Sequence, residues 1–163
     1  MGSSHAPVAR LESIRMFLAF ACFTNFKLFQ MDVKSAFLND FIDQEVYVDQ
    51  PPDFENEMFP NHVFKLLKAL YGLKQAPRAW SERSSGFLIE NGFKMGIVNT
   101  NLFTKQCSND LIIVQIYVDD IIFGATNEYL CKNFSTIMQK EFEMSMMGEL
   151  NFFLGFQVEQ TRE

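Results

Sequence analysis

Apolar residues recur at helical spacing in two stretches of the chain. In residues 10–23 and again after Asn127 they lie three or four positions apart, which predicts two amphipathic helices. The two apolar faces consist of Leu11, Ile14, Leu18 and Ala21, and of Leu130, Phe134, Ile137, Met138 and Phe142. A third helix is expected to begin near Pro77, because proline suits a first helical turn, and to end at the cap pair Asn91-Gly92.

Short apolar or alternating stretches between turn residues predict strands. They lie at residues 27–33, 45–49, 63–67, 102–104, 111–118, 121–123, 142–146 and 152–158. We expect residues 108–110 to form a turn, Gly124 to end a strand, and Gly148 to separate the last two strands. The elements show no regular βαβ alternation, which favours an α+β fold with a largely antiparallel sheet. The length of 163 residues is that of a single domain.

The composition disfavours several classes of chemistry. The chain holds 2 His and 3 Cys, all scattered, so a Cys/His zinc site and a histidine-based catalytic triad are disfavoured. An odd, dispersed set of cysteines favours a reducing compartment, and no stretch approaches the roughly 18 uncharged residues that a membrane span needs. We therefore expect an intracellular protein with no membrane partner.

The charge is negative overall but unevenly spread. The chain has 20 acidic and 14 basic residues, a net charge of −6, which counts against a domain that simply coats nucleic acid. Seven acids and no base lie between Asp40 and Glu57, whereas five bases and one acid lie between Lys65 and Arg83. Two solvated surfaces of opposite sign explain this pattern as well as a binding surface does.

Two adjacent carboxylates, Asp119 and Asp120, interrupt the most apolar segment of the chain, residues 111–124. An ionised carboxylate beside a buried core is unfavourable unless it is paired or bound to a metal. The alternative is a hairpin whose tight, exposed turn is Asp119-Asp120 itself. Asp32 also ends an apolar strand, and if the strands are neighbours, three carboxylates meet at one end of the sheet. Such an oxygen-rich site suits Mg²⁺, and two ions there would indicate phosphoryl transfer.

Several motifs, in order, resemble one family. The YVDD of residues 117–120 resembles the YxDD motif of reverse transcriptases, and Asp32 with Phe37 resembles their first catalytic motif. Five segments resemble the polymerases of plant copia-type LTR retrotransposons. They are QMDVKSAFL (30–38), VYVDQPP (46–52), ALYGLKQAPRAW (69–80), YVDDIIFG (117–124) and GELNFFLG (148–155). The resemblance covers about residues 6–160.

The resemblance implies a polymerase palm of ferredoxin-like fold, with helices on one face of the sheet, and part of the fingers. This single domain would span residues 6–163, residues 1–5 look like a tag or a fortuitous start, and the thumb and RNase H would be absent. The implied activity is transfer of a dNTP to a primer 3′-hydroxyl on an RNA or DNA template, with two Mg²⁺ ions for which Mn²⁺ can substitute. The implied partners are RNase H and integrase in a parent Pol polyprotein. The implied location is a cytoplasmic virus-like particle or the nucleus.

Roles at the site also follow from the resemblance. Asp32 and Asp119 resemble the ligands that bridge both metals, and Asp120 the more peripheral third ligand. The positions implied to contact nucleotide or template are Val33, Phe37, Gly72, Lys74, Gln75, Arg78 and Tyr117, and those implied to support the primer are Phe153, Leu154 and Gly155. Phe37 would exclude a ribose 2′-hydroxyl, although core packing is the alternative. Arg78 is explained equally well as a solvated helix start, and Trp80 is expected to be a core anchor.

Asp40 and Asp53 stand where this family usually has glycine. If those positions have φ > 0, each aspartate costs on the order of 1 kcal/mol. The alternative function is therefore a non-catalytic retrotransposon relic or domesticated fragment that acts as a folded interaction domain. A weaker alternative is a non-polymerase Mg²⁺ phosphotransfer domain on a similar palm.

Overall fold

The computed structural model of the protein describes residues 11–36, 45–68 and 76–161. Within these ranges the helices are α1 (Leu11–Thr24), α2 (Ala76–Glu90) and α3 (Glu128–Glu141). The strands are β1 (Leu28–Val33), β2 (Tyr47–Val48), β3 (Phe64–Lys65), β4 (Lys94–Met95), β5 (Leu102–Cys107), β6 (Asp110–Tyr117), β7 (Asp120–Ala125), β8 (Met144–Glu149), β9 (Phe152–Phe153) and β10 (Phe156–Gln157). Among these described helices, none has the length and apolar character needed to cross a membrane.

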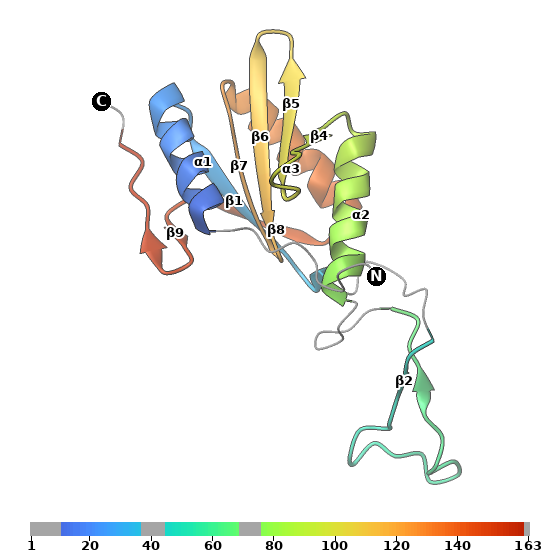
Figure 1. Cartoon of the computed structure of the whole chain (residues 1–163). Coiled ribbons are helices and arrows are strands. Elements are labelled where there is room, and N and C mark those ends of the chain that lie inside the picture. Colours follow the sequence, from blue (N-terminus) through green and yellow to red (C-terminus); the bar gives the residue numbers. More distant parts are fainter. Residues whose placement is uncertain (1–10, 37–44, 69–75, 162–163) are drawn as a thin grey trace.

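A six-stranded sheet in the order β4-β5-β6-β7-β1-β8 forms the centre of the structure (Figure 1). All five neighbouring pairs in it are antiparallel. The two short hairpins β2–β3 and β9–β10 form separate two-stranded sheets. The predicted α+β class with a largely antiparallel sheet is therefore confirmed.

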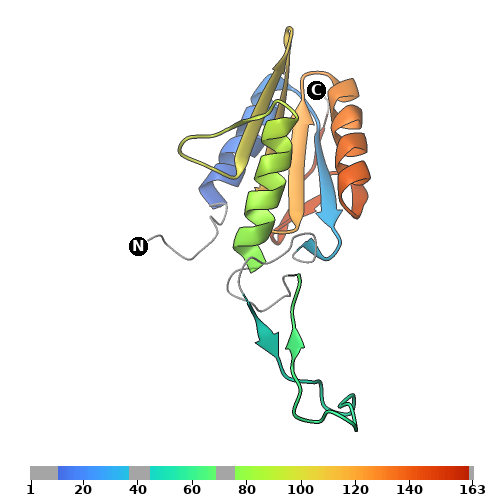
Figure 2. The ribbon, with the colours of Figure 1, turned by 90° about the vertical axis from the view of Figure 1, so that its right-hand side faces the viewer.

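Helices cover both faces of the sheet, with α1 on one side and α2 and α3 on the other (Figure 2). One core, next to α2 and α3, includes Met31, Val33, Phe103, Val114 and Phe123. The other, next to α1, includes Ile14, Phe17, Leu28, Ile113 and Ile122. The expectation of helices on one face was therefore wrong for α1, because its apolar stripe packs against the second face of the same strands.

The helix boundaries follow the sequence signals closely. The Asn127 side chain accepts a hydrogen bond from the Tyr129 N–H at 3.0 Å and so caps α3. Helix α2 begins at Ala76, beside Pro77, and Gly92 beyond its end has φ +83°, the left-handed conformation that glycine adopts at helix ends. The Asn25 residue that follows α1 also has a positive φ, and the chain turns there into β1.

Two glycines, one predicted to end a strand and one to form a turn, lie inside strands instead. Gly124 is the fifth residue of β7, and Gly148 lies in β8 next to a register shift opposite Gln30 and Met31. The last turn falls at Leu154–Gly155, between β9 and β10, where both residues have positive φ. The prediction failed because glycine marks close backbone approach and bulges as well as turns.

The loop between β2 and β3 is organised by one side chain. The amide nitrogen of Gln50 donates to the carbonyl oxygens of Phe59 and His62, both at 2.8 Å, and its oxygen accepts from the Asn56 N–H at 2.6 Å. In this loop Asp53 has φ +71°, a left-handed conformation that favours glycine, so the condition set for a cost at this position is met. Asp40 lies outside the described residues.

Gly124 should be intolerant of any side chain. An alanine Cβ at this position would lie 2.8 Å from the Lys27 carbonyl oxygen and 2.8 Å from Leu28 Cδ2, and the backbone atom cannot yield without moving β1. We expect Gly124→Ala to lower the unfolding free energy by about 1–3 kcal/mol in urea titrations. Gly86→Ala is the matched control: it lies in α2 with nothing within 4 Å of its Cβ, and it should gain up to about 1 kcal/mol. Equal effects of the two variants would contradict the packing argument.

Cys131 should be inert to thiol reagents in the folded protein. Its side chain is buried between α3 and the sheet, and burial, assisted by the Glu128 carboxylate, raises the pKa of the thiol to about 12. The unfolded thiol loses its proton near pH 9. Between pH 9 and about 12 the folded state therefore holds a proton that the unfolded state has lost, and the free energy of unfolding should fall as the pH rises through this range. Iodoacetamide at pH 8 should label exposed Cys22 first, and Cys131 only after unfolding. Rapid labelling of Cys131 in native buffer would contradict this burial.

Candidate active site

The strands that carry the predicted carboxylates are neighbours in the sheet. Strand β1 pairs with β7 in a register that places Asp32 directly opposite Asp120. Because cross-strand partners point to the same face, both side chains lie on the face that α1 covers further along the strands. Asp119 precedes β7 in the turn from β6, so the three carboxylates gather at one end of the two strands.

The alternative of an exposed Asp119-Asp120 turn was partly wrong. A β6–β7 hairpin exists, but its turn residues are Val118 and Asp119, whereas Asp120 is the first residue of β7 and pairs with Tyr117. Both aspartates are half-buried rather than exposed. The turn is shifted by one residue from the alternative, and this shift turns Asp120 towards the same face as Asp32.

Gln30 orients one of the carboxylates. Its amide nitrogen donates to Asp120 Oδ1 at 2.8 Å, across the β1–β7 pair. Burial is the largest cause that raises the pKa of Asp120; the Gln30 hydrogen bond lowers this pKa, and the carboxylates of Asp119 and Asp32 raise it further. The three acids therefore repel one another electrostatically within a partly buried site.

Two hydrogen bonds fix the turn that carries Asp119. The Trp80 indole N–H donates to the Val118 carbonyl oxygen at 2.6 Å, and the Val33 N–H donates to the Asp119 carbonyl oxygen at 2.9 Å. Val118 has φ +53°, a left-handed conformation that is rare for a β-branched residue. Trp80 is 2% exposed, so the predicted core anchor is confirmed, and its polar edge also contacts the candidate site.

Other predicted site residues adjoin this end of the sheet. Tyr117 makes an edge-to-face contact with Phe153, with ring centroids 5.8 Å apart, which brings the β9–β10 hairpin beside the YVDD segment. Leu154 and Gly155 form the turn of that hairpin. The Val33 side chain is buried in the core next to α2 and α3, so any contact of Val33 with a nucleotide would use its main chain.

Arg78 lies in the first turn of α2 and pairs along the helix. Its Nε donates to Glu82 Oε1 at 2.7 Å, and this hydrogen bond, with the Glu82 charge, raises the pKa of the guanidinium. This exposed i,i+4 pair fits the alternative of a solvated helix start. Predicted residues Phe37, Gly72, Lys74 and Gln75 lie outside the described residues.

The sequence reasoning missed two glutamines on the carboxylate face. Gln30 and Gln115 flank Ile122 in one cross-strand row, next to the row of Asp32, Asp120 and Tyr117. Gln115 is 1% exposed, and neither polar atom of its amide has a hydrogen-bond partner among the residues that the structure describes. Strand alternation was the available signal, because Gln30 lies two residues before Asp32 and so shares its face.

The carboxylates do not form a preformed metal shell. Within the described ranges, no group of three or more His, Cys, Asp or Glu side chains is arranged to hold a metal ion. Asp32, Asp119 and Asp120 are nevertheless close enough to interact electrostatically, and they offer only oxygen donors. The donor chemistry therefore fits a hard cation, although the side chains do not converge on a single point.

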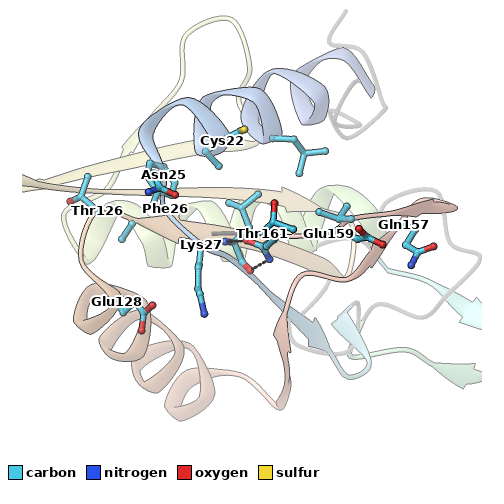
Figure 3. A pocket seen from close by; sticks show the side chains of 15 residues that line it. Cys22, Asn25, Phe26, Lys27, Thr126, Glu128, Gln157, Glu159 and Thr161 are labelled. Atoms are coloured by element: carbon cyan, nitrogen blue, oxygen red, sulfur yellow. Dashed lines mark hydrogen bonds between the residues drawn. The ribbon is translucent and has the colours of Figure 1, made fainter. Parts of the chain in front are cut away.

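A pocket lies at the other end of β1. The end of α1, the β7–α3 connection and residues 157–161 line it (Figure 3). Gln160 closes one side, since its amide donates to the Leu28 carbonyl oxygen at 2.9 Å and accepts from the Leu28 N–H at 2.8 Å. Lys27 in this pocket is five residues from Asp32 along an extended chain, roughly 16 Å away, so the pocket is separate from the carboxylates.

Asp120→Asn should stabilise the folded chain in a way that depends on pH. The folded-state pKa of Asp120 is raised, so the folded protein keeps a proton that the unfolded chain has lost, and its stability falls as pH rises through that range. Asparagine cannot ionise and keeps the oxygen that accepts from Gln30. We expect the variant to be more stable than the original chain at pH 7 in EDTA, with the difference shrinking as the pH falls towards about 4, the pKa of an unfolded aspartate. Urea unfolding at several pH values measures this, and a difference independent of pH would contradict it.

Comparison with known proteins agrees with the motifs. Residues 2–163 match the profile of the family described as reverse transcriptase (RNA-dependent DNA polymerase). The chain is 37% identical over 156 residues to a retrovirus-related Pol polyprotein from transposon RE1 of Arabidopsis thaliana, covering 96% of this chain and 11% of that protein. It is 33% identical to the corresponding polyprotein from transposon TNT 1-94 of Nicotiana tabacum, covering 96% of this chain and 12% of that protein.

A yeast relative is shorter. The putative transposon Ty5-1 protein of Saccharomyces cerevisiae is 35% identical over 131 residues, which cover 80% of this chain and 42% of that protein. The chain thus spans about a tenth of the plant polyproteins and less than half of the yeast protein. No solved structure matches the chain. The match over nearly every residue, together with the plant Pol relatives, confirms the resemblance: the chain belongs to the reverse transcriptase (RNA-dependent DNA polymerase) family.

Proposed function

We propose that the chain forms the catalytic palm, with part of the fingers, of an RNA-directed DNA polymerase encoded by a copia-type retrotransposon. The observation that carries this proposal is the register of β1 and β7, which sets Asp32 opposite Asp120 with Asp119 in the adjoining turn. By resemblance these three residues correspond to the family's catalytic motifs, and Asp32 lies about 90 residues before the other two in the sequence.

The proposed reaction joins a dNTP to a primer. The primer 3′-oxygen attacks the α-phosphorus of the dNTP, a new P–O bond forms, the bond to pyrophosphate breaks, and the hydroxyl proton leaves to water. Positioning and electrostatic stabilisation supply nearly all of the catalysis in such phosphoryl transfers. The task of this chain is therefore to hold the carboxylates at fixed positions, which the paired strands β1 and β7 support.

Asp32 and Asp119 would be the main ligands of two Mg²⁺ ions, with Asp120 in a more peripheral role. Oxygen donors without thiolate or imidazole suit Mg²⁺, and Mn²⁺ can substitute. Bound divalent ions supply positive charge that activates the attacking oxygen and stabilises the leaving phosphate. The same charge would offset the repulsion among the three carboxylates, and Gln30 would keep Asp120 in a fixed orientation.

The primer and the nucleotide are proposed to approach from the Tyr117 side of the site. The contact of Tyr117 with Phe153 supports the proposal that the Leu154–Gly155 turn holds a primer end. Arg78 at the start of α2, with the family positions Phe37, Gly72, Lys74 and Gln75, is proposed to contact nucleotide or template. Other Pol regions, namely RNase H and integrase, are the proposed partners in a parent polyprotein, within a virus-like particle or the nucleus.

Primer extension on a homopolymer RNA template tests this function. The 163-residue chain should add dNTPs in Mg²⁺ or Mn²⁺, and Asp32→Asn and Asp119→Asn should each reduce the rate more than about 100-fold, since even outer-shell partners of a metal contribute 10–100-fold. Asp110→Asn is the matched control, because Asp110 begins β6 at the end opposite Tyr117 and its Oδ1, which accepts from Thr126, is kept.

Three outcomes separate the hypotheses. Extension abolished by Asp32→Asn and Asp119→Asn but not by Asp110→Asn supports the polymerase. Extension that survives both site variants contradicts it. A folded chain that binds Mn²⁺ without extending any primer favours the alternative, a non-catalytic fragment that acts as an interaction domain.

A further inference from the structure

The single tryptophan of the chain links helix α2 to the turn that carries Asp119. Trp80 is buried at 2% exposure, and its ring packs edge-on against Phe142, with centroids 5.2 Å apart. Phe87 and Arg83, further along α2, pack against the same Phe142 ring. The three aromatic rings belong to the core next to α2 and α3, on the sheet face opposite Asp32 and Asp120, and the indole N–H reaches from this core to the turn.

That N–H acts on the peptide unit next to Asp119. It donates to the Val118 carbonyl oxygen at 2.6 Å, so it sets the plane of the peptide bond between Val118 and Asp119. Val118 has φ +53°, which a β-branched residue adopts only where its surroundings enforce it. Rotation of this peptide would break the hydrogen bond and leave the buried indole N–H without an acceptor and the Val118 carbonyl without this donor. Leaving a buried polar group unpaired is unfavourable, so the hydrogen bond opposes the rotation.

The opposite side of the turn is fixed by β1. The Val33 N–H donates to the Asp119 carbonyl oxygen at 2.9 Å, one residue after Asp32. The turn is thus held from α2 through Val118 and from β1 through Asp119. Asp32 and Asp120 are placed by strand pairing, whereas Asp119 depends on these two contacts for its position.

We propose that Trp80 is a positioning residue: its indole N–H holds Val118 in the left-handed conformation and so presents the Asp119 carboxylate beside Asp32 and Asp120. The inference rests on the proposed function, because it concerns the divalent-cation site formed by these three acids. Without the N–H, the Val118–Asp119 peptide relaxes, Asp119 moves away from the other two carboxylates, and cation affinity falls.

The test compares Trp80→Phe with Phe87→Leu, using Mn²⁺ as the probe. Trp80→Phe keeps an aromatic ring and removes the donor, whereas Phe87→Leu disturbs the same Phe142 ring from the same helix without touching the turn. Mn²⁺ affinity is measured by water-proton relaxation, and thermal unfolding reports the loss of packing. We expect Trp80→Phe to weaken Mn²⁺ binding by about 10-fold or more, and Phe87→Leu to leave it unchanged. In primer extension, kcat should fall for Trp80→Phe with little change in KM for the dNTP.

A rescue distinguishes positioning from general stability. Val118→Gly in the Trp80→Phe background should recover the Mn²⁺ affinity several-fold, because glycine adopts φ > 0 without a penalty. Where Trp80→Phe does not fold, replacement of Trp80 by benzothienylalanine, whose ring has the same shape with sulfur in place of the N–H, provides the second variant. The proposal is overturned if the variant without the N–H donor binds Mn²⁺ as tightly as the original chain. It is also overturned if Phe87→Leu reduces the Mn²⁺ affinity by as much as that variant does.

The wild-type chain gives a direct spectroscopic readout. A single tryptophan gives a single indole N–H resonance in a ¹H–¹⁵N spectrum. This resonance should exchange slowly with solvent and be broadened by Mn²⁺, and the broadening should be lost in Asp119→Asn. A wild-type chain that binds no Mn²⁺ refutes the proposed function together with this inference. Mn²⁺ binding that is insensitive to Trp80 refutes only the positioning role.

Discussion

The pairing of β1 with β7 is the constraint on which the rest of the site depends. Both strands lie inside the sheet, flanked by β8 and β6, and their apolar side chains enter the cores on both faces. A slip of one residue would send Met31 and Val33 to the α1 face and Asp32 into the opposite core. The burial of those apolar residues therefore decides which face Asp32 occupies, and it opposes any other register.

The same pairing concentrates negative charge, which works against the stability of the fold. Asp32 and Asp120 share a face, and burial together with the neighbouring carboxylates raises the pKa of Asp120. The Gln30 amide is the neutral group that offsets part of this cost. Repulsive groups maintained at the end of well-packed strands are typical of functional sites, where activity takes precedence over stability. The net charge of −6 adds to this repulsion across the chain.

Local sequence signals predicted the elements but not all of their contacts. The helix boundaries were predicted to within a few residues. The signals were the periods of the α1 and α3 faces, the Asn127 cap and the Gly92 terminus, which all act over about one helical turn. The face that α1 covers was wrong, since an amphipathic stripe does not specify its partner. Gly124 and Gly148 were misinterpreted because glycine also permits a close approach of two strands, as at Gly124, and a bulge, as at Gly148. Asp32 and Asp119 were expected to converge only on condition that their strands were neighbours, and the register supplied that condition.

The contacts that the sequence could not reveal are the ones that control Asp119. The Trp80 to Val118 hydrogen bond spans 38 residues and uses a main-chain oxygen, so no side-chain pattern encodes it. The left-handed φ of Val118 is equally invisible, because valine normally predicts extended strand. Strand pairing alone would fix the carboxylates of Asp32 and Asp120. It would leave Asp119 on a strained turn that could adopt other conformations. The α2 helix, whose aromatic cluster anchors Trp80, therefore contributes to the geometry of the site as well as to the core. The YVDD segment accordingly depends on a helix that begins some 40 residues before it, and a fragment containing only the sheet would lack the contact that orients its turn.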